Sequence, residues 1–191
     1  MIGLRDVRVE DNERILRWRN SPNVAKFMFT DRLISPEEHE RWFKKMLGDT
    51  DSRYWIIVCD NEDVGLVNVC NIDRTNSRCH WAFYVADPNV RGRGVGSFAE
   101  YSILRFVFDE LKLNRLCGEV LATNESVLRM HENFGFRQEG ILREHVQKQG
   151  IPVDVVCVAM LRREWVSVRP EVETRLRNRG LLQQTEGSCD C

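Results

Sequence analysis

The sequence predicts a fold of the α/β (α+β) class, in which a mixed, mostly antiparallel, twisted sheet of about seven strands is flanked by helices. Apolar strand-like runs alternate with amphipathic helical runs along most of the chain. Two pairs of these runs are joined by short polar turns, at residues 61–63 and 148–150, which is typical of antiparallel hairpins. A glycine-rich segment at residues 91–96 joins a strand to a helix in the middle of the chain.

The elements follow one another in a regular order. Strands are expected at residues 4–9, 54–60, 64–71, 80–85, 115–121, 136–147 and 153–161, and helices at residues 11–20, 35–47, 97–111 and 126–133. In the first helix, Asp11 stands in the N-cap position, and Ile15 and Trp18 share one face. The second helix has a strong N-terminal signal, because a capping Ser35 is followed by Pro36 and two acidic residues.

The second half of the chain carries a long amphipathic helix, a shorter helix and a final strand pair. The apolar side chains of helix 97–111 recur at helical spacing, and Gly135 ends helix 126–133. From residue 166 onward the chain becomes charged and then polar. We therefore expect one folded domain over residues 1–165 and a tail over residues 166–191 that is partly helical and then disordered.

Composition excludes several classes of protein. The chain has 191 residues, 42% of them hydrophobic, and a net charge of −1. Such a balance disfavours bulk electrostatic binding to nucleic acid or to a membrane surface, and no apolar run is long enough to span a bilayer. The seven cysteines are odd in number and form no C-x-x-C pair, which indicates reduced thiols in a cytoplasmic protein. No metal site is expected, including at Cys189-Asp190-Cys191.

The glycine-rich segment reads Arg91-Gly92-Arg93-Gly94-Val95-Gly96 and leads into a helix at Ser97. Glycines let the backbone approach a ligand closely, and the N–H groups that open a helix bind phosphate or pyrophosphate. The two arginines add charged donors. No lysine follows as a P-loop requires, and the glycine spacing is one residue too short for a dinucleotide-binding loop.

Two motifs resemble those of the GNAT superfamily of N-acetyltransferases. Arg91-x-x-Gly94-x-Gly96 is similar to the loop that holds the pyrophosphate of coenzyme A in that family, and the stretch from Asn124 to Phe136 is similar to the family motif after the fifth strand. The resemblance implies a sheet that splays open between strands 4 and 5, with acetyl-CoA lying in the gap. The implied cofactor-binding residues are Val85, Arg91, Gly92, Arg93, Gly94, Val95, Gly96, Ser97 and Asn124.

The resemblance also suggests catalytic residues. Many family members carry a tyrosine seven residues after the asparagine of the second motif as the proton donor to sulfur. In this chain that position is His131, and a histidine can serve as the acid because its ordinary pKa lies near 6.5. Tyr84 is expected close to the point of acetyl transfer. The strand over residues 81–85 offers no carboxylate as general base, which favours deprotonation of the amine through water.

The N-terminal half resembles the nucleotide-sugar branch of the family, whose members acetylate UDP-4-amino-4,6-dideoxy-N-acetyl-altrosamine in pseudaminic acid biosynthesis. The similarity lies in the segments 15–24 and 34–43 and in the strands that follow. The expected substrate-binding residues are Arg19, His39, Trp42 and Asn71. A guanidinium suits a phosphate, and an indole can stack on a ring.

Other acceptors remain open at this stage. The Trp18-Arg19-Asn20 feature also occurs in acetyltransferases that act on ribosomal-protein N-termini and on polyamines. Basic residues are interspersed with the acidic ones in the region 31–53, which suits an anionic substrate better than a polycation. The sequence thus predicts a small-molecule nucleotide-sugar substrate, with neither nucleic acid nor membrane as partner, and leaves a homodimer open.

Overall fold

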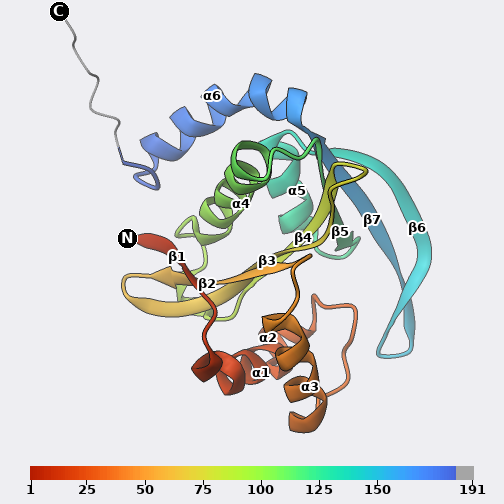
Figure 1. Cartoon of the computed structure of the whole chain (residues 1–191). Helices are drawn as coiled ribbons and strands as arrows, with labels where there is room; N and C mark the ends of the chain where they lie inside the picture. Colours follow the sequence, from red (N-terminus) through yellow and green to blue (C-terminus); the bar gives the residue numbers. More distant parts are fainter. Residues whose placement is uncertain (184–191) are drawn as a thin grey trace, which may run out of the picture.

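A computed structural model of the chain describes residues 1–183, which form one seven-stranded sheet in the order β1-β2-β3-β4-β5-β7-β6 (Figure 1). The strands are β1 (Ile2–Asp6), β2 (Arg53–Cys59), β3 (Glu62–Asp73), β4 (Arg78–Val85), β5 (Arg115–Leu121), β6 (Arg137–Lys148) and β7 (Ile151–Leu161). All neighbouring strands pair antiparallel except β4 and β5, which pair parallel. The predicted mixed, mostly antiparallel sheet is confirmed.

The helices cover both faces of the sheet. They are α1 (Asn12–Asn20), α2 (Pro22–Ala25), α3 (Pro36–Leu47), α4 (Val95–Arg105), α5 (Glu125–Phe134) and α6 (Arg162–Asn178), and a π-helical segment (Phe106–Glu110) extends α4. Adjacent residues of β2 show the two faces: Ile56 packs with Ile15 of α1 and Phe43 of α3, whereas Ile57 belongs to the larger core with α4. Figure 1 shows α1–α3 grouped on one side and α4–α6 on the other.

The parallel ladder between β4 and β5 is short. Only residues 78–80 of β4 pair with residues 115–117 of β5. Beyond this point β5 stays paired with β7 and β4 stays paired with β3, but the facing edges of β4 and β5 separate. The expected opening between strands 4 and 5 is therefore confirmed.

Asp11 is the N-cap residue of α1, as predicted, but its side chain does not cap the helix. Its carboxylate makes no cap hydrogen bond to α1 and instead accepts from both terminal nitrogens of Arg5, at 2.7 Å each, and from the backbone N–H of Arg8. Burial opposes ionisation of Asp11, but these hydrogen bonds outweigh it and hold the pKa at about 2. The buried carboxylate ties β1 to the start of α1.

Helix α6 continues across the predicted boundary between residues 165 and 166. Trp165, Val172 and Leu176 are buried in the main core, and the hydroxyl of Tyr101 on α4 donates to Glu173 at 2.9 Å. The described part of the predicted tail is thus helical to Asn178 and packs on α4. Predicted disorder toward the end of the chain, and the pair Cys189 and Cys191, lie outside the described residues.

The long β6–β7 hairpin reaches the segment that follows α2. At its tip, Gln149 and Gly150 adopt left-handed conformations, as a two-residue hairpin turn requires. The ammonium group of Lys148 donates to the carbonyl oxygens of Ala25 and Met28, at 3.0 and 2.8 Å. These contacts fix the α2–α3 connection against a hairpin that is more than a hundred residues away in sequence.

We expect Gly65→Ala to destabilise the protein, because Gly65 lies directly against β4. A Cβ atom there would stand 2.2 Å from the carbonyl oxygen of Tyr84, which is backbone and cannot rotate away. The cost should be about 1–3 kcal/mol or more, measured by chemical denaturation. The control is Gly3→Ala on β1, where a Cβ meets nothing within 4 Å, and an equal loss in both variants would contradict the expectation.

Candidate active site

A cleft of about 840 Å³ opens where β4 and β5 separate. Its walls come from the unpaired ends of β4 and β5, the glycine loop with the first turn of α4, helix α5, and the α1–α2 region. The chain therefore brings segments from both halves of the sequence to a single cavity that crosses the sheet.

The glycine loop forms one end of the cleft. Gly94 is the N-cap of α4 and adopts a left-handed conformation with φ of 85°, which glycine adopts without strain. Arg91 and the residues Gly92, Gly94, Val95, Gly96 and Ser97 line the cavity. Because the first N–H groups of a helix have no partner within it, the loop presents donors and a positive dipole end to a bound anion. The site fits the pyrophosphate of coenzyme A.

Arg93 does not belong to this cradle. Its guanidinium pairs with Asp60 at the β2–β3 turn, and it is absent from the residues that line the cleft. The two arginine side chains of the motif therefore point in different directions. Arg91 alone faces the cleft.

Beyond the loop, β4 offers a free backbone edge. Val85 pairs with Gly65 of β3 on one side, and the ladder to β5 ends at His80 on the other. The remaining N–H and C=O groups of β4 can bond to an extended amide-containing arm as a further strand would. Asn124, at the start of α5, also lines the cleft, as predicted for a residue that contacts this arm.

His131 lines the middle of the cleft although its side chain is only 4% exposed. Its Nδ1 lies 2.8 Å from a carboxylate oxygen of Glu100, which is fully buried on α4. Sequence reasoning missed Glu100. The signal was available, because Glu100 stands three and four residues before Ile103 and Leu104 and hence on the inward face of the helix.

The other end of the cleft collects several of the predicted acceptor residues. Arg19 of α1 and Asn71 of β3 line it, together with Tyr84. The Tyr84 hydroxyl is buried without a hydrogen-bond partner in the described part of the chain, and burial raises its pKa above the usual range. Burial also lowers the pKa of Arg19, opposed by Tyr84, although an arginine remains charged at neutral pH.

His39 and Trp42 lie outside the cleft lining, which corrects the prediction for both. The His39 ring is buried under α1, where its Nε2–H donates to the carbonyl oxygen of Asn12 at 3.0 Å. Burial lowers its pKa, so it carries no charge for a phosphate at neutral pH. Trp42 packs edge-on against Tyr54. Both residues hold α3 in place and do not face the cavity.

Two polar residues that were not predicted face the cleft. His80 is the last residue of β4 to pair with β5, and Glu119 follows two residues after its partner Cys117. Glu119 is the one carboxylate of residues 1–183 in the cleft lining. The missed signal was an acidic residue within the strand at residues 115–121, whose other residues from Leu116 onward carry no charge.

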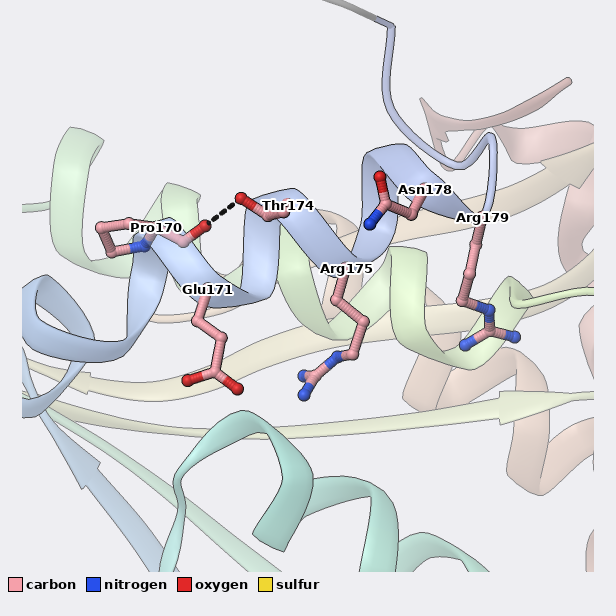
Figure 2. Close-up of a pocket in the computed structure, with 6 residues that line it drawn as sticks. All are labelled: Pro170, Glu171, Thr174, Arg175, Asn178 and Arg179. Atoms are coloured by element: carbon pink, nitrogen blue, oxygen red, sulfur yellow. Dashed lines mark hydrogen bonds between the residues drawn. The ribbon is translucent and has the colours of Figure 1, made fainter.

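The surface between α6 and α5 continues toward the cleft. Figure 2 shows Glu171 and Arg175 extending from one side of α6 toward α5, with Arg179 just after the end of α6. Arg179 lines both this surface and the cleft, and Leu181 follows it against the glycine loop. The end of α6 thus borders the entrance at which the loop would hold a cofactor.

The comparison with family models agrees with this geometry. A model described as "Acetyltransferase (GNAT) domain" matches residues 2–137. The chain belongs to the GNAT acetyltransferase family. As a GNAT acetyltransferase it is an N-acetyltransferase that uses acetyl-CoA, and the cradle at Gly94 and the free edge of β4 fit that molecule.

Relatives of this GNAT protein carry different names. The acetyltransferase PseH of Campylobacter jejuni is 32% identical over 127 residues, which cover 66% of this chain and 77% of PseH. The spermidine N(1)-acetyltransferase of Escherichia coli is 25% identical over 141 residues, which cover 74% of this chain and 75% of the relative. The crystal structure of spermidine N-acetyltransferase from Vibrio cholerae with CoA and spermine superposes with a TM-score of 0.80 at 22% identity, covering 86% and 98% of the two chains, which shows a shared fold.

Three further observations concern metal binding, membrane spanning and the cysteines. Among residues 1–183, no group of three or more histidine, cysteine or acidic side chains is placed to hold a metal ion. In the same part of the chain, no helix is long and apolar enough to cross a bilayer. The cysteines at positions 59, 70, 79, 117 and 157 are free thiols.

We expect Arg91→Gln to weaken acetyl-CoA binding, because it removes a charged donor that faces the cleft. The dissociation constant measured by calorimetry should rise about tenfold. Arg93→Gln is the matched control and should leave binding within about twofold, because its lost ion pair is exposed. A larger effect from Arg93 than from Arg91 would contradict the assignment.

Proposed function

We propose that the protein transfers the acetyl group of acetyl-CoA to the 4-amino group of a nucleotide-linked amino-deoxy sugar, UDP-4-amino-4,6-dideoxy-N-acetyl-altrosamine, in pseudaminic acid biosynthesis in the cytoplasm. Support comes from the resemblance of the N-terminal half to that branch and from the similarity to PseH. The observation that carries the proposal is the charge at the acceptor end of the cleft.

Arg19 supplies that charge. It is half-buried, lines the cleft and makes no ion pair with a carboxylate of residues 1–183. A guanidinium that has lost part of its hydration and has no internal counter-ion favours an anionic ligand. The diphosphate of a nucleotide sugar provides such a group, whereas a polyamine would be repelled.

Aromatic side chains stand beside this cation. Phe27 and Phe29, after α2, line the cleft close in sequence to Asn23. Apolar rings can pack on a nucleobase or on the ring of a deoxy sugar. The Lys148 contacts described above hold this segment in place, which favours a preformed acceptor pocket.

The chain's own residues can carry out a direct transfer. Bound acetyl-CoA supplies the activated thioester. The free edge of β4 near Val85 orients the arm, and a backbone N–H there polarises the thioester carbonyl. His131 gives a proton to the leaving sulfur. Glu119, the acidic residue of the cleft, takes the proton that the attacking amine loses, directly or through water.

The alternative acceptors are polyamines and ribosomal-protein N-termini. The similarity to spermidine acetyltransferases favours the first. Glu119 is the one carboxylate of residues 1–183 in the cleft lining, and Arg19 is the cation at the end opposite the glycine loop. A pocket for a polyamine needs more acidic than basic side chains, so the nucleotide sugar is the better match.

An acceptor panel tests the proposal. Purified protein with acetyl-CoA should release free thiol with UDP-4-amino-4,6-dideoxy-N-acetyl-altrosamine at a kcat/KM at least about a hundredfold above that for spermidine or an N-terminal peptide. The 4-acetamido product should be identified by mass spectrometry. Turnover with spermidine or peptide alone would reject the nucleotide-sugar assignment and leave the acetyltransferase activity in place.

Arg19→Gln tests the charge argument. The KM for the nucleotide sugar should rise about tenfold or more, because one charged phosphate contact is lost, while the KM for acetyl-CoA stays unchanged. Arg17→Gln is the control on the same helix, since Arg17 is exposed and does not line the cleft. Equal effects of the two substitutions would remove Arg19 from the acceptor site.

A further inference from the structure

We propose that Glu100 is a positioning residue for catalysis: its buried carboxylate holds Nδ1 of His131, so that the ring presents Nε2 to the cleft and keeps a proton there for the leaving sulfur. The proposal rests on the function above insofar as His131 is the proton donor. It assigns a role to a buried acidic side chain that neither the loop motif nor the acceptor site explains.

The geometry of the pair leaves one nitrogen for the cleft. His131 Nδ1 lies 2.8 Å from Glu100 Oε1, and the two side chains are 4% and 0% exposed. The ring of Trp81 meets the imidazole edge-on at 5.3 Å, and the ring of Phe136 lies 5.2 Å away on a tilt. These contacts prevent rotation of the ring. Since His131 also lines the cleft, Nε2 is the nitrogen available to a ligand.

Few charged groups surround the pair. Trp81 of β4 and Phe136 before β6 are neutral, and Glu100 is the acidic group from α4. Arg175 of α6, whose side chain extends toward α5 in Figure 2, donates to the carbonyl oxygen of Asn133 at 2.7 Å. Burial raises the pKa of the Glu100 carboxyl, while His131 and then Arg175 oppose that effect.

Burial explains why this arrangement retains the proton on Nε2. With one proton between the two side chains and one on Nε2, the pair carries no net charge, wherever the shared proton sits. Loss of the Nε2 proton would leave a net negative charge in an apolar setting, which is costly. The buried carboxylate therefore favours the form of the pair in which Nε2 bears its proton.

The proton balance of the transfer is complete. When the bond between the acetyl carbon and sulfur breaks, the electron pair stays on sulfur and the Nε2 proton moves to it. The attacking amine loses one proton to Glu119 or water, and one proton returns to Nε2 from solvent. No further reactant is needed.

A purely structural role for Glu100 fits the contacts less well. The second carboxylate oxygen, Oε2, has no hydrogen-bond partner in the described part of the chain. A buried acid with one unsatisfied oxygen costs stability, and an apolar residue on this face of α4 would pack at no such cost. The imidazole of His131 is the neighbour that accounts for an acidic residue at position 100.

The first measurement needs no acceptor. Long-range ¹⁵N–¹H NMR spectra of histidine-labelled protein report which ring nitrogen bears a proton, and His131→Gln identifies the His131 signals. We expect Nε2 of His131 to be protonated at pH 7.5. A deprotonated Nε2 at that pH would overturn the proposal, whatever the acceptor proves to be.

The second measurement compares variants across pH, with whichever acceptor is turned over. Glu100→Gln should lose kcat on the alkaline side at least about one pH unit earlier than the wild type, with kcat at pH 8 reduced about tenfold and the KM for acetyl-CoA within about twofold. Glu132→Gln, on the exposed side of α5, is the control and should match the wild type.

The two variants distinguish failure of the His131 mechanism from failure of the Glu100 role alone. If His131→Gln retains full kcat, His131 is not the acid and the proposed mechanism fails with it. If His131→Gln is impaired while Glu100→Gln follows the wild-type pH profile, only the role of Glu100 is wrong. Thermal unfolding of each variant verifies that the fold is intact, and the NMR result decides the case if Glu100→Gln does not fold.

Discussion

The separation of β4 from β5 is the feature on which the rest of this molecule depends. Three pairs of residues join the strands, and the ladder stops where Trp81 faces Gly118. The indole nitrogen lies 3.4 Å from the position that a Cβ of Gly118 would occupy, so the ring packs closely on the Gly118 backbone at the point where the ladder ends. The open edges of the two strands then become hydrogen-bonding surface for a ligand instead of for each other.

The opening also explains why the site combines segments that are far apart in the sequence. Helix α4 begins at the end of β4, so its N-terminal N–H groups face the gap, and α5 begins at the end of β5 on the other side. A parallel pair directs both helix starts to the same edge of the sheet. The glycine loop and His131 therefore reach the same cleft because β4 and β5 are parallel.

Sequence patterns predicted the parts of this protein that are set by local chemistry. The glycine loop before α4, the hairpins and the helix that carries His131 each depend on residues close together in the chain. Side-chain direction is different: Arg91 and Arg93 stand two apart in one motif, yet only a contact with Asp60 from another turn decides that Arg93 faces away. His39 failed as a prediction for the same reason, because the carbonyl of Asn12 that binds it belongs to another helix.

The contact between the β6–β7 hairpin and the segment after α2 lets changes in the hairpin affect the shape of the cleft. Lys148 and the backbone N–H of Gln149, which donates to Asp31 at 2.7 Å, join the segment after α2, where Met28 lines the cleft, to a hairpin tip that does not line it. Insertions or substitutions in that tip can move Met28 and its neighbours without disturbing Gly94. Changes in this hairpin tip can thus reshape the wall of the cleft that follows α2, while the glycine loop at the other end of the cleft stays the same.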